Sequence, residues 1–304
     1  MDLRVLNYFL AIAREENFTR AAQMLHVTQP TLSRQIAQLE EELGVKLFTR
    51  SNRNIILTED GMILKRRARE MLALAEKTRQ DLMHRDEELA GKITIGSGEF
   101  KSTRILSQMI AAFSEKHPLV QYEIYSGNAD NIQDYIERGL LDMGLMAEPV
   151  DIRRYDVIPM PVQEKWGAWV RADSALSKKE WIQPEDLAGE RLIVAAGDFV
   201  KSRIGKWLGD YKDRAKMIAE GNLLYNEMVL AESGLGVVLG IQLNCAYEGL
   251  QFVPFYPVLE AGTALAWKKE QVFTPATSAF FAFAKQYEKA ISNDTNNLPG
   301  ALPV

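Results

Sequence analysis

Two helices joined by a tight turn between residues 18 and 44 constrain this chain more than any other feature of its sequence. Thr19 can cap the first, over residues 20–25. Thr28 can cap the second, with Pro30 in its first turn, where the missing amide proton is not needed. The second helix carries apolar residues at helical spacing until a glycine ends it: Leu32, Ile36, Leu39, Leu43 and Gly44. This arrangement is typical of a helix-turn-helix unit.

The second helix also has a polar face. Its apolar side has to pack inward, so the polar residues of its first turns face outward, where a recognition helix meets base edges in the major groove. Glutamine can pair with adenine, arginine with guanine, and serine or threonine with a base or a phosphate. We therefore predict DNA contacts from Thr28, Gln29, Pro30, Thr31, Ser33, Arg34 and Gln38.

A small β-wing is predicted directly after these helices. Residues 45–48 and 54–57 are strand-like, and a basic, polar stretch joins them. Its arginines, Arg50 and Arg53, suit the DNA backbone or minor groove beside the recognition helix. The alternative is that both are solvated surface charges. His26, between the two helices, is interpreted as a turn residue rather than a residue that reads bases.

A long helix is expected after the wing. Thr58 can cap it, and the lack of glycine over residues 62–90 lets it run to about Leu89, roughly 45 Å. Steps of four and three residues connect a mostly apolar series: Leu64, Ala68, Met71, Ala75, Thr78, Leu82, Arg85 and Leu89. The series predicts a coiled-coil seam and therefore a dimer. The alternative is a helix that packs on its own domain.

From Lys92 onward strands and helices alternate, which predicts parallel βαβ units. The first series has strands over 93–96, 120–125 and 143–146 and helices over 105–116 and 131–138. The second has strands over 167–171, 191–194, 215–219 and 236–239 and helices over 200–209 and 224–233. Strands near 251–253 and 263–268 and a helix over 277–291 follow, and the polar tail, 293–304, is expected to be flexible.

These patterns come with a family resemblance. The chain resembles the LysR-type transcriptional regulators over residues 1–292, most closely in a gapless motif that runs Phe18-Thr19-x-Ala21-Ala22-x-x-Leu25-x-Val27-Thr28-Gln29-Pro30-Thr31-Leu32-Ser33-x-Gln35-Ile36-x-x-Leu39-Glu40-x-x-Leu43-Gly44-x-x-Leu47-Phe48-x-Arg50 and continues Leu57-Thr58-x-x-Gly61. A motif of this length is highly specific.

The resemblance implies an α+β multidomain protein. It would comprise an N-terminal winged helix-turn-helix over 1–58, a dimerising linker helix over 59–90, and a C-terminal two-lobe α/β effector domain over 91–292, like a type 2 periplasmic binding protein. Lobe I would contain 91–162 and 268–292, and lobe II 163–267. The function implied is sequence-specific, ligand-responsive control of transcription. The protein would act as a dimer of dimers (a homotetramer) on an interrupted palindrome, with RNA polymerase as a further partner.

A small-molecule effector is expected in the cleft between the lobes, beyond the carboxyl ends of the strands. Its predicted contacts are Gly98, Glu99, Phe100, Lys101, Ser102, Asn128, Glu148, Phe199, Val200 and Lys201. The family implies a carboxylate held by helix N-termini, and we expect a small polar molecule with at least one. The acids Glu99 and Glu148, if both point inward, would instead favour a neutral or amine-bearing ligand.

Composition narrows the class of protein. The net charge of the chain is −5, but it is unevenly distributed: residues 1–85 carry a net charge of +3, and residues 86–304 carry −8. A basic N-terminal part is consistent with DNA binding by that part. One cysteine, three separated histidines and no phosphate loop predict no disulfide, metal, cofactor or enzyme activity. A charged N-terminus and short apolar runs predict a cytoplasmic protein without a membrane segment. The alternative function is a small-molecule binding protein with no role on DNA.

Overall fold

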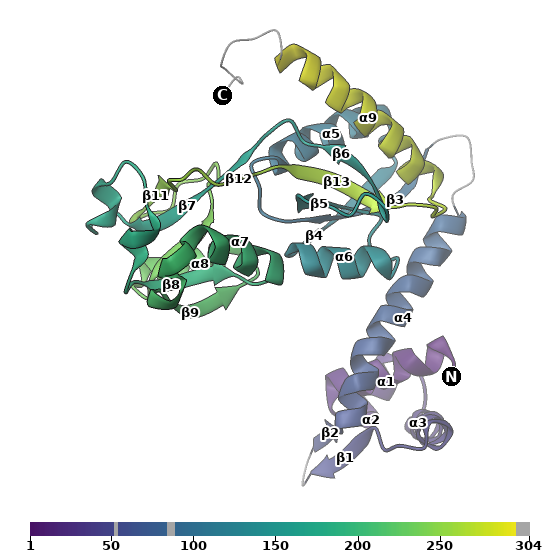
Figure 1. Cartoon of the computed structure of the whole chain (residues 1–304). Helices are drawn as coiled ribbons and strands as arrows, with labels where there is room; N and C mark the ends of the chain where they lie inside the picture. Colours follow the sequence, from purple (N-terminus) through teal and green to yellow (C-terminus); the bar gives the residue numbers. More distant parts are fainter. Residues whose placement is uncertain (52–53, 84–88, 296–304) are drawn as a thin grey trace. The chain divides into compact units, whose positions relative to one another are not determined.

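The structure is a computed structural model that describes residues 1–51, 54–83 and 89–295. The chain divides into two compact units, Met1–Met83 and His84–Val304, each with its own core (Figure 1). Across the described ranges, no helix combines the length and the apolar character that a membrane span requires.

The first unit is a set of helices with a β-hairpin. Its elements are α1 (Leu3–Glu15), α2 (Phe18–Met24), α3 (Gln29–Leu43), β1 (Phe48–Ser51), β2 (Asn54–Leu57) and α4 (Glu59–Met83). The side chain of Thr28 caps α3 as expected, and Gly44 ends it with a left-handed φ of 69°. The N-cap of α2 is Asn17, two residues before the predicted Thr19. The side chain of Asn17 accepts hydrogen bonds from the amides of Thr19 and Arg20 in the first turn of the helix.

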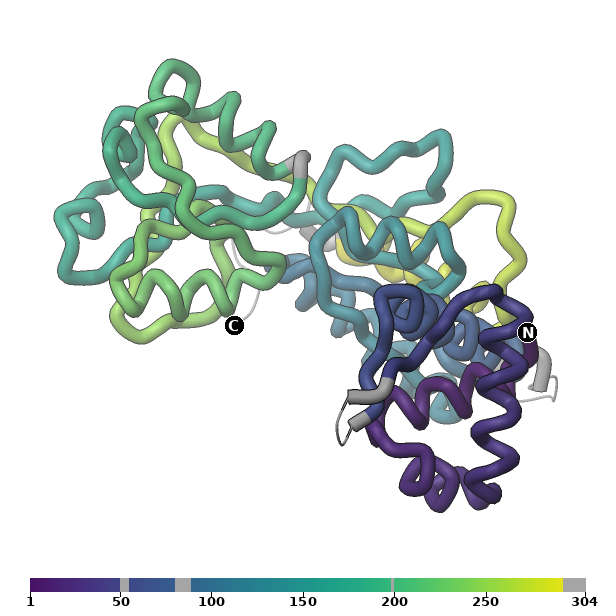
Figure 2. Tube along the Cα trace, turned by 90° about the horizontal axis from the view of Figure 1, so that it is seen from below, coloured from purple at the N-terminus to yellow at the C-terminus, as the bar shows by residue number. Residues whose placement is uncertain are grey.

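One core holds these elements together. Phe9 and Leu32, from α1 and α3, are fully buried in it, and the ring of Phe9 lies 5.2 Å from that of Phe48 in the hairpin. Figure 2 shows the backbone trace of this unit in purple to dark blue. Because α3 uses its apolar side here, its polar side is left facing solvent.

The beginning of the seam predicted on α4 belongs to this same core. Leu64 and Ala68 are buried among the residues of α1, and Met71 packs partly against them. Their partners are therefore in the same domain, as in the alternative interpretation. Leu89 packs against the core of the second unit, and the side chain of Leu82 lies outside the described residues. The helix ends at Met83 in the described part of the chain, short of the expected Leu89.

Lobe I of the second unit is a five-stranded sheet of order β4-β3-β5-β13-β6. Its strands are β3 (Gly91–Ser97), β4 (Val120–Ser126), β5 (Met143–Ala147), β6 (Tyr155–Pro159) and β13 (Thr263–Lys268). One face packs on α5 (Thr103–Lys116) and α9 (Pro275–Thr295), and the other packs on α6 (Ala129–Glu137) (Figure 1). Strands β3, β4 and β5 are parallel, as the alternating pattern predicts.

Lobe II is a second sheet, of order β11-β7-β10-β8-β9, with β12 paired to β7. Its elements are β7 (Glu164–Arg171), β8 (Arg191–Ala195), α7 (Asp198–Leu208), β9 (Lys216–Gly221), α8 (Leu224–Glu232), β10 (Val237–Ile241), β11 (Leu250–Pro254) and β12 (Glu260–Ala261), with short 3₁₀ turns at Leu176–Lys178, Pro184–Leu187 and Gly209–Arg214. The loops before α7 and α8 thus lie at the carboxyl ends of β8 and β9.

The second crossing between the lobes comes earlier than predicted. β13 pairs antiparallel with β5 and β6, so the chain is back in lobe I by Thr263 rather than near Trp267. The physical reason is burial: β13 is buried along nearly its whole length, which requires a central position in a sheet. β6, which pairs with it, was missed in the sequence. The last helix runs to Thr295, into the stretch expected to be a tail, and residues 296–304 lie outside the described residues.

Candidate functional site

The predicted recognition helix presents its polar residues as expected. Gln29, Arg34 and Gln38 are exposed along α3, and Ser33 is half-buried. Thr28 and Thr31, also exposed, have their hydroxyl oxygens 2.8 Å apart, which ties both to the start of the helix, and Pro30 is exposed between them. The face of α3 is therefore a row of amide, hydroxyl and guanidinium groups on a rigid support.

The turn before α3 is unusually tight. His26 adopts a left-handed backbone with φ of 54°, a conformation that favours glycine, which supports its interpretation as a turn residue. The hydrogen bond from the Val27 amide to the Ala22 carbonyl, 3.0 Å, closes the turn and sets the angle between α2 and α3.

Glu40 attaches the wing to the recognition helix, a role that the sequence analysis missed. Its carboxylate accepts hydrogen bonds from the amides of Leu47 (2.9 Å) and Phe48 (3.4 Å) and from Lys46 Nζ (2.7 Å). Burial acts to raise the pKa of Glu40, but these donors outweigh it and the pKa lies below its ordinary value. A charged Glu40 thus holds the wing in register with α3.

The wing itself is the expected antiparallel hairpin. Arg50 is opposite Ile55 in its register, and its side chain lies outside the described part of the structure. Arg53 also lies outside the described residues. At the base of the hairpin, Gly61 lies so close to Leu47 that a Cβ atom would overlap the Leu47 carbonyl oxygen. The close approach explains the glycine in the Leu57-Thr58-x-x-Gly61 motif.

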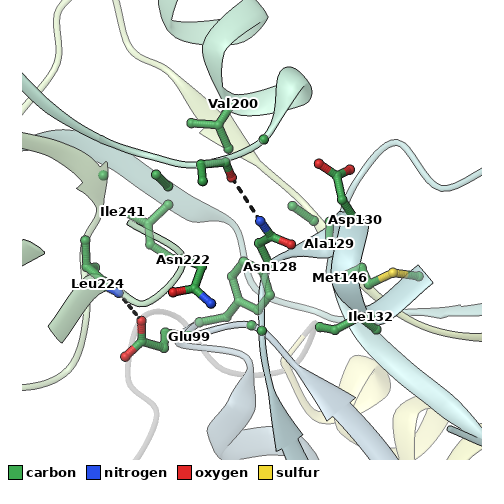
Figure 3. A pocket seen from close by; sticks show the side chains of 18 of the residues that line it. Glu99, Asn128, Ala129, Asp130, Ile132, Met146, Val200, Asn222, Leu224 and Ile241 are labelled. Atoms are coloured by element: carbon green, nitrogen blue, oxygen red, sulfur yellow. Dashed lines mark hydrogen bonds between the residues drawn. The ribbon is translucent and has the colours of Figure 1, made fainter. Parts of the chain in front are cut away.

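A cavity of about 120 Å³ lies between the two lobes of the second unit (Figure 3). It is at the carboxyl ends of strands from both sheets, where the α/β rule places a ligand. Lobe I contributes Gly98, Glu99, Phe100, Gly127, Asn128, Ala129, Asp130, Ile132, Leu145, Met146 and Ala147. Lobe II contributes Trp166, Ala195, Ala196, Gly197, Val200, Asn222, Leu224, Glu227, Gly240 and Ile241.

Five of the predicted contacts line this cavity: Gly98, Glu99, Phe100, Asn128 and Val200. The backbone of Phe199 lies beside it in the first turn of α7, and its side chain is outside the described residues. The other four, Lys101, Ser102, Glu148 and Lys201, are not among the residues that line it. Sequence position after a strand could not show this, since it does not say which way a side chain points.

Those four residues make contacts away from the cavity. Lys101 Nζ donates to Gln242 Oε1 at 2.7 Å, and Lys201 Nζ lies 2.9 Å from Glu220. Ser102 is fully buried, and its hydroxyl accepts a hydrogen bond of 2.7 Å from Thr263. Glu148 lines a separate hollow that Arg203 and Glu260 also line. Neither lysine is among the described residues that line the cavity.

Glu227 is the most unusual residue of the cavity, and the sequence analysis missed it. Its side chain is 1% exposed, and neither carboxylate oxygen has a hydrogen-bond partner among the described residues. Burial, with a smaller contribution from the charge of Glu99, raises the pKa of Glu227 to about 8. A signal was present, since the spacing of Leu224, Glu227, Met228 and Ala231 puts a carboxylate on the apolar face of its helix.

Among the lining residues drawn in Figure 3, two hydrogen bonds connect the lobes. Glu99 Oε2, from lobe I, accepts from the Leu224 amide at the start of α8 in lobe II. Asn128, which caps α6 through its Oδ1, donates from Nδ2 to the Ala196 carbonyl of lobe II at 3.2 Å. A ligand that enters the cavity meets both connections, so it can change how the lobes are held.

Comparisons with known proteins agree on both parts of the chain. Residues 3–62 match the model for the bacterial regulatory helix-turn-helix protein of the lysR family, and residues 86–289 match the LysR substrate binding domain. The Hca operon transcriptional activator HcaR of Escherichia coli K12 is 29% identical, over 94% of this chain and 98% of its own length. The regulator YbhD of the same organism is 27% identical, over 92% and 90%.

Solved structures show the same architecture. Full-length CbnR in complex with its target DNA aligns over 94% of this chain and all of its own, at 20% identity, with a TM-score of 0.72. A full-length point mutant of BenM aligns over 99% of this chain and 100% of its own, at 22% identity, with a TM-score of 0.55. At these identities the likeness concerns the fold alone.

Proposed function

Because the chain belongs to the LysR family and is a DNA-binding transcriptional regulator with an effector-binding domain, we propose that α3 reads its operator and that the cavity between the lobes holds its effector. The family is one of regulators rather than enzymes. The observation that carries the proposal is the exposed polar face of α3, fixed by the Thr28 cap and tied to the wing by Glu40.

On DNA, we assign base contacts to the first turns of α3, as in other recognition helices. The contacts would come from Thr28, Gln29, Pro30, Thr31, Ser33, Arg34 and Gln38, with backbone contacts from Arg50 and Arg53 in the wing. The protein would work in the cytoplasm, as a dimer of dimers on an interrupted palindrome, and would act on RNA polymerase from there.

We place the dimer contact on another face of α4 than the predicted seam, because the core of the first unit buries Leu64 and Ala68 of that seam. Ile63 and Leu74 are exposed by 56% and 42%, and their spacing of eleven residues puts them on one side of the helix, away from the buried Leu64 and Ala68. Apolar side chains exposed in this way on a helix suit a second copy of the same helix.

In the effector domain, we assign ligand contacts to Gly98, Glu99, Phe100, Asn128, Val200 and Glu227. A ligand would act by favouring one arrangement of the lobes over another, to an extent limited by its difference in affinity for the two. Such a shift would break or rearrange two hydrogen bonds between the lobes, one from the Leu224 amide to Glu99 and one from the Asn128 side chain to the Ala196 carbonyl.

The test is operator binding by variants of α3. We expect Gln29→Ala and Arg34→Ala to weaken binding to a fragment of the protein's own promoter by about 1–3 kcal/mol each, with little loss on random DNA. Gln23→Ala, an exposed glutamine of α2, is the matched control and should have no effect. Equal losses on promoter and random DNA would contradict base reading by α3.

A further inference from the structure

We propose that the cavity between the lobes takes a small organic cation, a primary amine with an apolar body, whose ammonium group lies between Glu227 of lobe II and Glu99 of lobe I. This inference rests on the effector role of the cavity proposed above and names the chemical class of its ligand. It differs from the carboxylate that the family resemblance led us to expect.

The charge of the cavity is the first argument. Three carboxylates line it, those of Glu99, Asp130 and Glu227, and no lysine or arginine is among the described residues that do. The two lysines predicted nearby are engaged with Gln242 and Glu220 outside the lining. With Glu227 largely protonated at neutral pH, Glu99 and Asp130 still give the lining a negative charge that repels an anionic ligand. A cation is attracted by that charge and can ionise Glu227 as it binds.

The burial of Glu227 is the second argument. A carboxyl group that is almost fully buried and has no hydrogen-bond donor among the described residues lacks the partner that such groups normally have. The group packs against Gly221, where an added Cβ would come within 2.7 Å of Glu227 Oε1. The backbone on that side has thus left room for the carboxyl group and supplies no donor to it. An ammonium group brings three donors and can satisfy these oxygens.

The third argument concerns the helix N-termini at the cavity, which are the usual sites for anions. At the start of α5, the amides of Lys101 and Ser102 both donate to the buried Glu164 of lobe II at 3.0 Å. At the start of α8, the Leu224 amide donates to Glu99. The chain's own carboxylates therefore occupy two of the helix N-termini near the cavity, which removes them as sites for a ligand carboxylate. Of the other two, α6 is capped by Asn128, and α7 begins at the cavity after Gly197 without a side-chain cap.

The walls and the size of the cavity define the rest of the ligand. Apart from the acids, two asparagines and the indole Nε1 of Trp166, which has no hydrogen-bond partner among the described residues, the lining side chains are apolar, among them Phe100, Met146 and Ile241. A dry cavity of roughly 150 Å³ accommodates benzene, so about 120 Å³ suits an apolar body of roughly five or six heavy atoms. Aromatic rings beside a cation add cation–π attraction where they lie within reach.

Binding between Glu99 and Glu227 would also connect the ligand to the lobes. The charge of Glu99 raises the pKa of Glu227, which means that the two carboxyl groups repel each other when both are ionised. A cation between them is attracted by the charge of Glu99 and, once Glu227 ionises, by both groups, so it draws one lobe toward the other. It also favours the ionised form of Glu227, so binding below pH 8 should release a proton.

The test compares three probes of nearly equal size on the full chain: n-butylammonium, 1-butanol and butyrate. At pH 7 an alkylamine is fully protonated. We expect calorimetry to show n-butylammonium binding at least about tenfold more tightly than the other two, because only it is attracted by the charge of Glu99 and can form an ion pair with Glu227 as that group loses its proton. Titrations in two buffers of different ionisation enthalpy should show close to one proton released per ligand, since most of Glu227 is protonated at that pH.

The variants assign the effect to one residue. Glu227→Gln should remove most of the preference for n-butylammonium and abolish the proton release. Glu232→Gln, an exposed position on the same helix, is the matched control and should change neither. Tighter binding of butyrate, unchanged binding of n-butylammonium by Glu227→Gln, or no binding of n-butylammonium at all would each overturn the proposal. Operator binding by the ligand-free protein tests the regulatory function separately, so one proposal can fail while the other stands.

Discussion

Replacing Glu227 by glutamine should stabilise the second unit increasingly as the pH rises. Burial holds the pKa of Glu227 at about 8 in the folded chain, against an ordinary value of 4.5 when unfolded. The folded state therefore keeps a proton that the unfolded state has lost. Its stability is undiminished below pH 4.5 and decreases as the pH rises toward 8, where the folded state also begins to ionise.

The size of this effect follows from the two pKa values. Each pH unit between them lowers the free energy of unfolding by about 1.4 kcal/mol, so the loss between pH 5 and pH 9 is roughly 4 kcal/mol. Glutamine has nearly the same volume and does not titrate over this range. Its buried amide costs about 1–3 kcal/mol if it finds no partner, but this cost is independent of pH. The difference between variant and parent should thus grow with pH.

The assay is urea unfolding of the ligand-free full chain at pH 5, 7 and 9, followed by tryptophan fluorescence. All five tryptophans lie between residues 166 and 267, so the signal reports on the second unit. Glu232→Gln, with the same change of charge at an exposed position of α8, should run parallel to the parent at every pH. If Glu227→Gln also runs parallel to the parent, the carboxyl group is not protonated in the folded state and the reasoning is wrong.

Three further predictions concern other parts of the chain. Gly61→Ala should destabilise the first unit by about 1–3 kcal/mol, because its Cβ would overlap the Leu47 carbonyl, and thermal unfolding followed by circular dichroism would show it. Ile63→Asp combined with Leu74→Asp should abolish the dimer in light scattering, whereas Met62→Asp, on another side of α4, should not; a persisting dimer would exclude this face. Glu164→Ala should increase limited proteolysis of the chain near residue 164, since it leaves the Lys101 and Ser102 amides without an acceptor, and an unchanged cleavage rate would contradict the role of Glu164 in connecting the two lobes.

The helix-turn-helix could be predicted in detail from sequence because its determinants are local. The Thr28 cap, the apolar spacing from Leu32 to Leu39 and the terminal Gly44 are all where the sequence places them. The polar face of α3 follows, since the apolar residues can pack on only one side of a helix. The wing and the parallel strands of lobe I were predicted for the same reason.

Only the tertiary structure decided which residues meet. The seam predicted on α4 packs into its own domain at Leu64 and Ala68, because an apolar series does not state whether its partner is in the same chain. The sequence of β13 predicts a strand. Its position between β5 and β6, which sets the end of lobe II, depends on pairing with strands that are far away in the sequence.

The cavity was likewise predicted in part from the sequence and decided in part by the tertiary structure. The carboxyl ends of the strands predicted where it lies and five of the residues around it. The sequence could not show that Lys101 and Lys201 turn away, or that Glu227 turns in from a helix far beyond Glu99 in the chain. The charge of a buried site depends on which ionisable side chains line it. The packing of the two lobes determines which side chains those are, and the order of residues along the chain does not.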